Sequence, residues 1–389
     1  MQILEVRGNG RERGRAHGEA LRLMVHEHLA RWRQALLEDL LVDPDTYVDE
    51  FLSDTDFVAS AQQHTPDLLD EVRGISEGAG TDWRYTFVRQ LSDEEPWYRR
   101  ARKLGAWPGR SRVMQRDPDA GQFGGAVPPK GCSSVGRNAG AGQPMLIAQN
   151  MDCPLWFDGH QVALKVSDPR TGVDAWVFTV AGKISLAGMN SRGLAMTCNT
   201  LYQLDYNPCG LAEDFVVRGY LAQPDVQAGL DFMQRIPHAS GQNYTVPGPG
   251  GQVLNLECSR GGVVRWRPWA GADRVFHTNH ALASTDDAIY REQFAAVAEL
   301  QRKRLNSETT ASRFAELQRW FGDARELITA ERVKAALSSK IGPLCREGEH
   351  EGRRDGYTIG CLLLHLGETP FMEIAPGPPN RVLFQTLRF

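Results

Sequence analysis

The sequence predicts an α+β fold in which helices cover two β-sheets packed face to face. In the first third of the chain, apolar residues recur at three- and four-residue spacing, as in amphipathic helices. After Gly131, short β-rich segments separated by turn residues dominate, and two helical segments interrupt them. Strands and helices interleaved in this way favour a single layered domain with the helices outside. Two separate domains divided near residue 131 remain an alternative.

The helical segments are predicted at four places. The first runs from Arg11 to about Leu41, and the second from about Ala59 to Ala79. Pro66 in the second is expected in a first helical turn or at a kink. The other two cover about 212–235 and 285–304, and the last of these follows residues suited to capping a helix.

The strand predictions begin after a segment of different character. Residues from about 97 to 130 are basic and rich in Gly and Pro, which indicates an exposed linker or a long loop. The segments that follow combine β-branched or aromatic residues with flanking turn residues. The predicted strands are PMLIAQNMD, QVALKVSD, AWVFTVAG, GLAMTCNTL, QVLNLEC, GVVRWRPW, RVFHTNH, TIGCLLLHL, PFMEIAP and RVLFQTLRF.

Composition limits the classes of partner and location. The chain has 389 residues, with 44 Lys and Arg against 48 Asp and Glu, and this balance argues against nucleic acid as a partner. It has no run of about 18 apolar residues, so no membrane partner is expected. The first residues lack the apolar core of a signal peptide, and the seven cysteines form no CxxC pair. Reduced thiols and a cytoplasmic location are therefore expected.

The segment GCSS at 131–134 draws attention to one thiol, that of Cys132. A nucleophilic thiol needs partial exposure and a nearby base or positive group. Gly131 leaves its own carbonyl open to attack, which would suit a chain that cleaves its own Gly131–Cys132 bond. The alternative is a buried, inert cysteine at the start of a strand.

Several short segments then occur in a shared order over most of the chain: RGRAHGEALR, LLDEVRGISEGAG, GCSS, AQNMD, GKISLAGMNSRGLAMTCNTL, HTNH, LCR and APGPP. On these segments, the chain resembles the acyl-coenzyme A:6-aminopenicillanic acid acyltransferase (isopenicillin N acyltransferase) family of self-processing N-terminal-nucleophile hydrolases. The resemblance implies a four-layer αββα sandwich. It also implies a precursor cut before Cys132 into a helical chain, 1–131, and a catalytic chain, 132–389, which stay associated.

The resemblance assigns roles to individual residues. Cys132 would be the nucleophile and Asp152 the acceptor that orients its freed amino group. Asn279 would donate a hydrogen bond to the oxyanion, with Asn199 as a second donor. Arg346 would lower the pKa of the thiol or hold Asp152; the alternative is an ordinary surface arginine.

Two further positions in AQNMD belong to this set. Asn150 is expected to brace its strand. Gln149 stands where bile-salt hydrolases and penicillin V acylases carry an arginine, and it matches the acyltransferase family instead. For Asp152 the alternative is a strand-end aspartate that bonds its own backbone, as expected of Asp158.

A freed α-amino group has a pKa near 7.7–8.0, so it can serve as the general base for its own thiol. The expected activity is hydrolysis or transfer of an acyl group from a small amide, peptide-like conjugate or thioester through a Cys132 thioester.

No cofactor motif is present and a metal site is not expected, because His277 and His280 would lie on opposite faces of a strand. A homo-oligomer is left open. The alternative function is an unprocessed binding or scaffold protein on the same fold.

Overall fold

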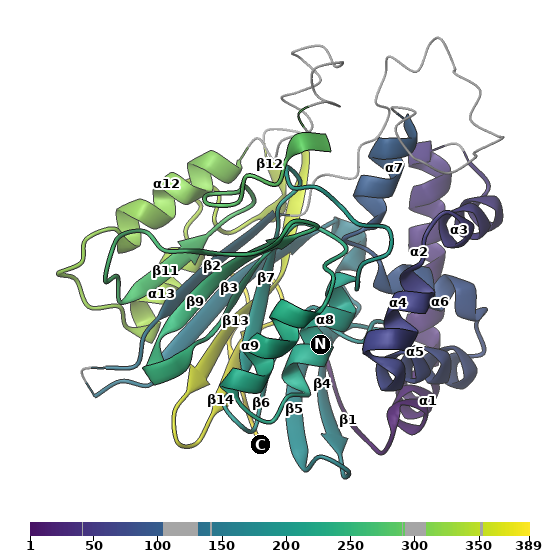
Figure 1. Cartoon of the computed structure of the whole chain (residues 1–389), viewed down its shortest axis with the longest axis horizontal. Coiled ribbons are helices and arrows are strands. Elements are labelled where there is room, and N and C mark those ends of the chain that lie inside the picture. Colours follow the sequence, from purple (N-terminus) through teal and green to yellow (C-terminus); the bar gives the residue numbers. More distant parts are fainter. Residues whose placement is uncertain (41, 104–130, 141, 290, 292–308, 351–352) are drawn as a thin grey trace.

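The computed structural model describes residues 1–40, 42–103, 131–140, 142–289, 291, 309–350 and 353–389 (Figure 1). Within these residues the strands form two sheets that lie between layers of helices. No helix among them is both long and apolar enough to cross a membrane.

The first sheet has eight strands among the described residues, and it begins with a strand from the N-terminus of the chain. That strand, β1, pairs parallel with β4, whereas the later neighbours in the sheet pair antiparallel. In spatial order the strands are β1 (Gln2–Arg7), β4 (Gln161–Asp168), β5 (Val173–Val180), β6 (Ala187–Asn190), β7 (Ala195–Thr200), β8 (Gln242–Pro247), β9 (Val253–Ser259) and β10 (Gly262–Trp266).

The second sheet, of seven described strands, carries the predicted nucleophile. Its strands pair antiparallel, with Gly131 opposite Asp152 and Cys132 opposite Met151. In order they are β11 (Arg274–His277), β2 (Gly131–Arg137), β3 (Met145–Cys153), β13 (Arg353–Leu366), β14 (Phe371–Ala375) and β15 (Gln385–Arg388), and β12 (Glu347–His350) pairs with β13.

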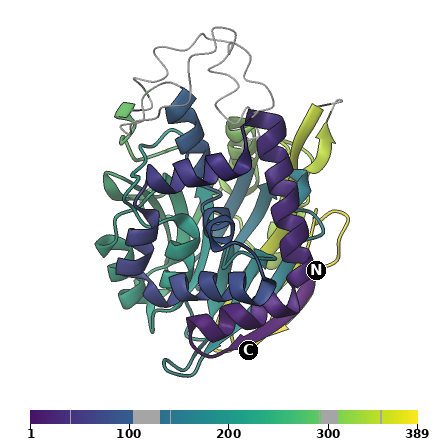
Figure 2. The same cartoon turned by 90° about the vertical axis from the view of Figure 1, so that its right-hand side faces the viewer.

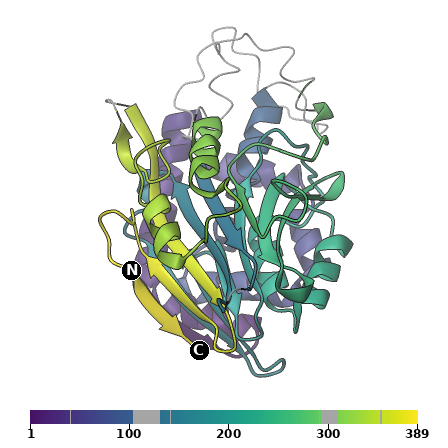
Figure 3. The same cartoon turned by 90° about the vertical axis from the view of Figure 1, so that its left-hand side faces the viewer.

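Helices cover the outer face of each sheet. The N-terminal helices lie over the eight-stranded sheet (Figure 2), and α12 and α13 lie over the seven-stranded sheet (Figure 3). The helices are α1 (Gly10–Ala20), α2 (Arg22–Leu40), α3 (Pro44–Ser53), α4 (Phe57–His64), α5 (Pro66–Ala79), α6 (Trp83–Gln90), α7 (Glu95–Lys103), α8 (Glu213–Leu221), α9 (Val226–Arg235), α12 (Thr310–Phe321) and α13 (Ala330–Leu337).

The buried apolar side chains of the described residues gather in three cores, one at each boundary between layers. The first joins the N-terminal helices and α8–α9 to the eight-stranded sheet, and it includes the fully buried Phe215. The second fills the space between the sheets around Phe178 and Ile359, and the third lies beneath α12 and α13 around Phe321. Each such buried side chain contributes roughly 1.5–3 kcal/mol. This order of layers confirms the predicted αββα sandwich.

Helices α1 and α5 touch backbone to backbone, which explains two of the glycine-containing motifs. Gly10, Gly14 and Gly18 face α5, and a Cβ atom on Gly14 would lie 1.9 Å from the carbonyl oxygen of Glu71. From the other side, a Cβ atom on Gly74 would lie 2.4 Å from a carbonyl oxygen of α1. Glycine is therefore required here for packing, because any side chain would force the helices apart.

The predicted helices exist but divide differently. The first is broken at Leu21 into α1 and α2. The second is divided at Thr65, and Pro66 opens α5 at its first position, so the expectation of a first-turn proline is correct. The segment predicted at 212–235 contains α8 and α9. Most of the helix predicted at 285–304 lies outside the described residues.

Other elements were not predicted. Residues 97–103 were assigned to the linker, but they belong to α7, where Trp97 and Tyr98 are buried against the N-terminal helices. Residues 104–130 lie outside the described residues. Strand β1 was missed because apolar and polar residues alternate only weakly along it, and Val6 is its one buried residue. Strand β8 was missed because its buried residues include polar ones.

Candidate active site

Cys132 is the second residue of β2, and its side chain lies buried in the core between the two sheets. Its backbone N–H donates to Oδ1 of Asn279 at 2.8 Å. Its carbonyl oxygen accepts a hydrogen bond from Arg313. The backbone of the predicted nucleophile is therefore held on both sides by side chains from distant parts of the chain.

Asp152 and Arg346 lie beside the predicted cleavage site. Asp152 is fully buried on β3, and its Oδ1 accepts from the hydroxyl of Thr358 at 2.6 Å. Nε of Arg346 lies 3.6 Å from Oδ2 of the same carboxylate. The hydroxyl of Thr358 also accepts from the backbone N–H of Arg346 at 2.9 Å, so it links the two groups.

Gly131 packs directly against this ion pair. A Cβ atom at this position would lie 2.9 Å from Nη1 of Arg346 and 3.0 Å from Oδ2 of Asp152. Such distances are too short for a carbon atom, so a larger residue would push the ion pair aside. Glycine at this position therefore lets the ion pair lie close to the backbone before Cys132, and a larger residue would require the ends of both side chains to shift.

The surroundings of Cys132 keep its thiol protonated in the intact chain. Burial raises the pKa of the thiol well above its usual value, and the negative charge of Asp152 raises it further. A hydrogen bond from the Asp152 backbone acts in the opposite direction but does not cancel these effects. The thiol consequently needs a base to take its proton before it can attack a carbonyl.

Asn279 follows β11, and both ends of its amide are engaged. Oδ1 accepts from the Cys132 nitrogen and, at 2.7 Å, from Nη2 of Arg313. Nδ2 donates to the carbonyl oxygen of Thr200 at 3.0 Å. The residue thus contacts the backbone nitrogen of Cys132, through its side-chain oxygen. Its expected role as an oxyanion donor would require Nδ2 to leave Thr200.

Asn199 on β7 lies on the facing sheet. Its Oδ1 accepts from the hydroxyl of Ser134 at 2.7 Å and from Nδ2 of Asn243 at 3.1 Å. Its Nδ2 is buried and has no hydrogen-bond partner among the described residues. A buried N–H group without a partner is costly, so this donor is available to a ligand or an oxyanion.

The two remaining predicted residues serve the strand itself. Nδ2 of Asn150 donates to the carbonyl oxygens of Leu337 and Leu344, each at 2.7 Å, and so ties β3 to the end of α13. Nε2 of Gln149 donates to the carbonyl oxygen of Cys198 on the facing sheet. Both contacts agree with supporting positions.

Arg313 and two threonines belong to the same cluster but were not predicted. The hydroxyl of Thr309 accepts from Arg346 and, at 3.2 Å, from Nε of Arg313, and it thereby links the two guanidinium groups. The sequence does not distinguish Arg313, because an arginine in an amphipathic helix is expected to be exposed to solvent. Thr358 likewise resembles any other residue of a strand.

The two histidines that were considered as metal ligands, His277 and His280, have separate hydrogen-bond partners. His277 is bonded to Glu257 at 2.9 Å, and His280 to the hydroxyl of Thr310 at 2.9 Å. Asp158, which was expected to be an ordinary turn aspartate, accepts from the side-chain Nε2 of Gln161 at 2.8 Å.

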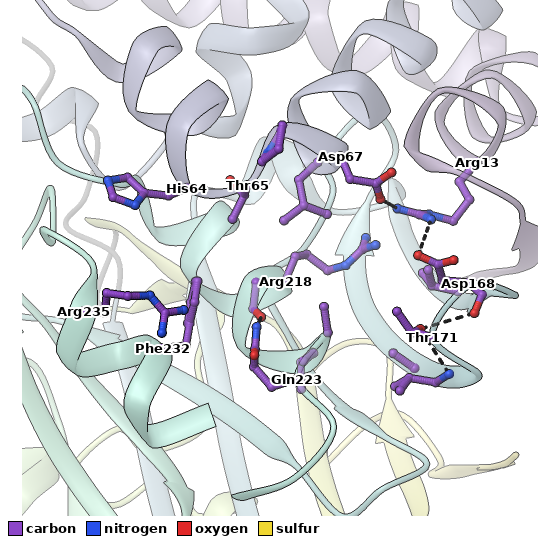
Figure 4. Close-up of a pocket in the computed structure, with 18 residues that line it drawn as sticks. Arg13, His64, Thr65, Asp67, Asp168, Thr171, Arg218, Gln223, Phe232 and Arg235 are labelled. Atoms are coloured by element: carbon purple, nitrogen blue, oxygen red, sulfur yellow. Dashed lines mark hydrogen bonds and ion pairs between the residues drawn. The ribbon is translucent and has the colours of Figure 1, made fainter. Parts of the chain in front are cut away.

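A cavity of about 220 Å³ lies elsewhere, between the start of α5, the β4–β5 hairpin and α8–α9 (Figure 4). None of the predicted site residues lines it. Two arginines on its wall, Arg13 and Arg218, are both bonded to the buried carboxylate of Glu71, at 2.9 and 2.8 Å. The charged groups here join α1 and α5 to α8, which is a structural role.

Known proteins show partial similarity to the chain. No curated protein sequence matches it. Among solved structures, an N-acylethanolamine-hydrolyzing acid amidase ortholog of Caenorhabditis elegans is 14% identical, with 66% of this chain and 99% of that chain covered and a TM-score of 0.42. The conjugated bile acid hydrolase of Clostridium perfringens is 11% identical, covers 66% and 92%, and has a TM-score of 0.43. The penicillin V acylase of Agrobacterium tumefaciens is 11% identical, covers 66% and 86%, and has a TM-score of 0.36.

The family comparison gives a match over residues 142–330, to acyl-coenzyme A:6-aminopenicillanic acid acyl-transferase. This region contains Asp152, Asn199 and Asn279, whereas Cys132 and Arg346 lie on either side of it. The match confirms the resemblance found in the sequence: residues 142–330 are similar to the acyl-coenzyme A:6-aminopenicillanic acid acyl-transferase family.

Proposed function

We propose that the chain is a self-processing cysteine N-terminal-nucleophile amidohydrolase or acyltransferase. The observation that carries this proposal is the environment of the Gly131–Cys132 bond. Gly131 is packed against the Asp152–Arg346 pair, and the nitrogen of Cys132 is bonded to Asn279. A structural cysteine at the start of a strand needs none of these contacts.

Processing would begin with attack of the Cys132 sulfur on the carbonyl carbon of Gly131. The carbon–nitrogen bond breaks as a thioester forms, and the proton of the thiol passes to the released α-amine. Water then hydrolyses the thioester, which leaves a carboxylate on Gly131 and restores the thiol. The products are chains 1–131 and 132–389, held together by the layers that they share.

The free α-amine would then act as the base in turnover. Its pKa lies near neutrality, and it is on the same residue as the thiol whose proton it takes. The thiolate attacks the substrate carbonyl, the amine of the substrate leaves, and the acyl group stays on sulfur. Water completes a hydrolase cycle, whereas a second amine completes a transferase cycle.

Two groups would support these steps. Asp152 is opposite Gly131 in the sheet, where its carboxylate could accept a hydrogen bond from the new ammonium group. Nδ2 of Asn199, which has no hydrogen-bond partner among the described residues, would supply a donor for the oxyanion. Such a donor is worth roughly 2.7–4 kcal/mol in comparable sites. The substrate class is a small amide, a peptide-like conjugate or a thioester.

The test is the intact mass of the purified protein, read together with its N-terminal sequences. The wild type is expected to give two chains that begin at Met1 and Cys132, whereas Cys132→Ala should remain whole at 43.3 kDa. Cys153→Ala is the matched control, because it removes another buried thiol of the same core. It should be processed like the wild type.

A second measurement addresses turnover. Incubation with a panel of amides and thioesters should add an acyl group to Cys132, detected by mass spectrometry of the peptide that carries it. A wild-type chain that stays whole and forms no adduct would favour the unprocessed binding protein instead.

A further inference from the structure

Arg313 is a fully buried arginine near the start of α12, and its guanidinium group reaches the nucleophile. Nη1 donates to the carbonyl oxygen of Cys132 and to the hydroxyl of Ser133 at 3.1 Å. Nη2 donates to Oδ1 of Asn279 at 2.7 Å. One rigid, planar group therefore spans both the nucleophile and the side chain that holds its nitrogen.

This bridge decides which end of the Asn279 amide faces Cys132. An asparagine can present either its oxygen or its NH2 group to a neighbour. Because a guanidinium group only donates, the atom of Asn279 that faces Arg313 must be the oxygen. The same oxygen accepts from the Cys132 nitrogen at 2.8 Å.

The orientation matters once Cys132 carries a free amine. An oxygen of Asn279 accepts one hydrogen of that amine and leaves its lone pair available for the proton of the thiol. If the side-chain amide of Asn279 were flipped, its NH2 group would donate a hydrogen bond to the lone pair of the Cys132 amine. The amine could then no longer act as a base. Hydrogen bonds from charged groups are about twice as strong as neutral ones, so Arg313 favours the productive orientation strongly.

We propose that Arg313 is a positioning residue, which acts by holding the oxygen of Asn279 toward the amine of Cys132. The inference rests on the proposed function, because it concerns the amine that processing would release. It assigns to Arg313 a role distinct from that of Arg346, which lies on the Asp152 side of the cleavage site.

The experiment compares Arg313→Gln, Arg313→Lys and Arg137→Gln with the wild type. Arg137 is the matched control, since it is a buried arginine of the same strand as Cys132 and donates to the carbonyl oxygens of Ile328 and Pro144. The probe is a set of N-acyl-4-nitroanilides, and rates are divided by the fraction of chains with a free Cys132 N-terminus.

Arg313→Gln is expected to lower kcat by about tenfold to a hundredfold, with KM changed by less than about twofold. Arg313→Lys keeps the charge but loses the forked geometry, so part of kcat should return. Arg137→Gln should lower the melting temperature but leave kcat near the wild-type value.

The inference is overturned if Arg313→Gln keeps wild-type kcat, or if both glutamine variants lose kcat in proportion to their loss of stability. Should Arg313→Gln fold without being processed, Arg313→Lys decides the matter. A reduced kcat at constant KM then supports the role, and wild-type kcat refutes it. A wild-type chain that is neither processed nor active points instead to failure of the proposed function, so the two failures are distinguishable.

Discussion

Glu71 is predicted to hold the two proposed chains together. It lies on α5 and bonds to Arg13 on α1 and to Arg218 on α8. The bond to Arg218 crosses the boundary between residues 1–131 and 132–389. The side chains of all three residues are at most 4% exposed. Glu71→Gln keeps the size of the side chain but removes the charge that two buried guanidinium groups share.

The expected cost follows from that burial. Removal of one partner from a buried ion pair costs about 3–5 kcal/mol, because the remaining charge stays desolvated. For a chain of 389 residues, this corresponds to a melting temperature about 4–6 °C lower. Glu77→Gln, on the same helix, is the control: Glu77 pairs with Arg11 at the surface, with both side chains more than 40% exposed. Its expected cost is below about 1 kcal/mol.

The dependence on pH gives a second readout. Burial alone raises the pKa of Glu71, but the charges of Arg218 and Arg13 outweigh it, so the pKa lies below its usual value of 4.5. A carboxyl group with a lowered pKa stabilises the fold above its unfolded pKa, and this stabilisation disappears as the pH falls through the folded pKa. Glu71→Gln should therefore differ most from the wild type near neutral pH, and less in acid.

The assay is thermal unfolding across pH, with size-exclusion chromatography to follow the association of the two chains. Equal melting temperatures for Glu71→Gln and Glu77→Gln near neutral pH would refute the reasoning. So would a difference between them that grows as the pH falls.

Two further predictions concern processing. Gly131→Ala places a Cβ atom 2.9 Å from Nη1 of Arg346 and 3.0 Å from Oδ2 of Asp152. Cleavage, measured as loss of the intact chain over time, should therefore slow by about tenfold to a hundredfold. An unchanged rate of cleavage would contradict the packing argument. Because burial and Asp152 raise the pKa of the Cys132 thiol, the rate of cleavage should increase from about pH 6 to pH 9, followed by mass in timed samples. A rate that falls over this range would be inconsistent with attack by the thiolate.

Hydrophobic pattern predicted the layers of the fold well and its polar strands poorly. The apolar strands β5 and β13 were found because their side chains belong to the cores. Strand β8 contains Gln242 and Asn243, which are buried and hydrogen-bonded to other polar side chains, so its sequence resembles a loop. Strand β1 gains its stability from pairing with β4, a contact that local pattern does not contain.

The residues of the candidate site were likewise predicted only in part from the sequence. Short motifs identified Cys132, Asp152 and Asn279, and the structure places Asp152 and Asn279 beside Cys132 and its preceding glycine. Arg313 could not be predicted, because its role depends on α12 packing over β2 and on the absence of solvent around it. Pattern also did not reveal that the oxygen of Asn279, and not its NH2 group, faces the Cys132 nitrogen.

Strand β1 also has a consequence for the assembly of the protein. It covers the edge of β4 with a row of backbone hydrogen bonds that come from the N-terminal segment. A separate chain 132–389 would expose this edge together with the apolar face beneath α1–α7, and exposed edges of this kind pair with other chains and aggregate. The two halves are therefore suited to being made as one precursor, and production of each half alone would be expected to yield insoluble protein.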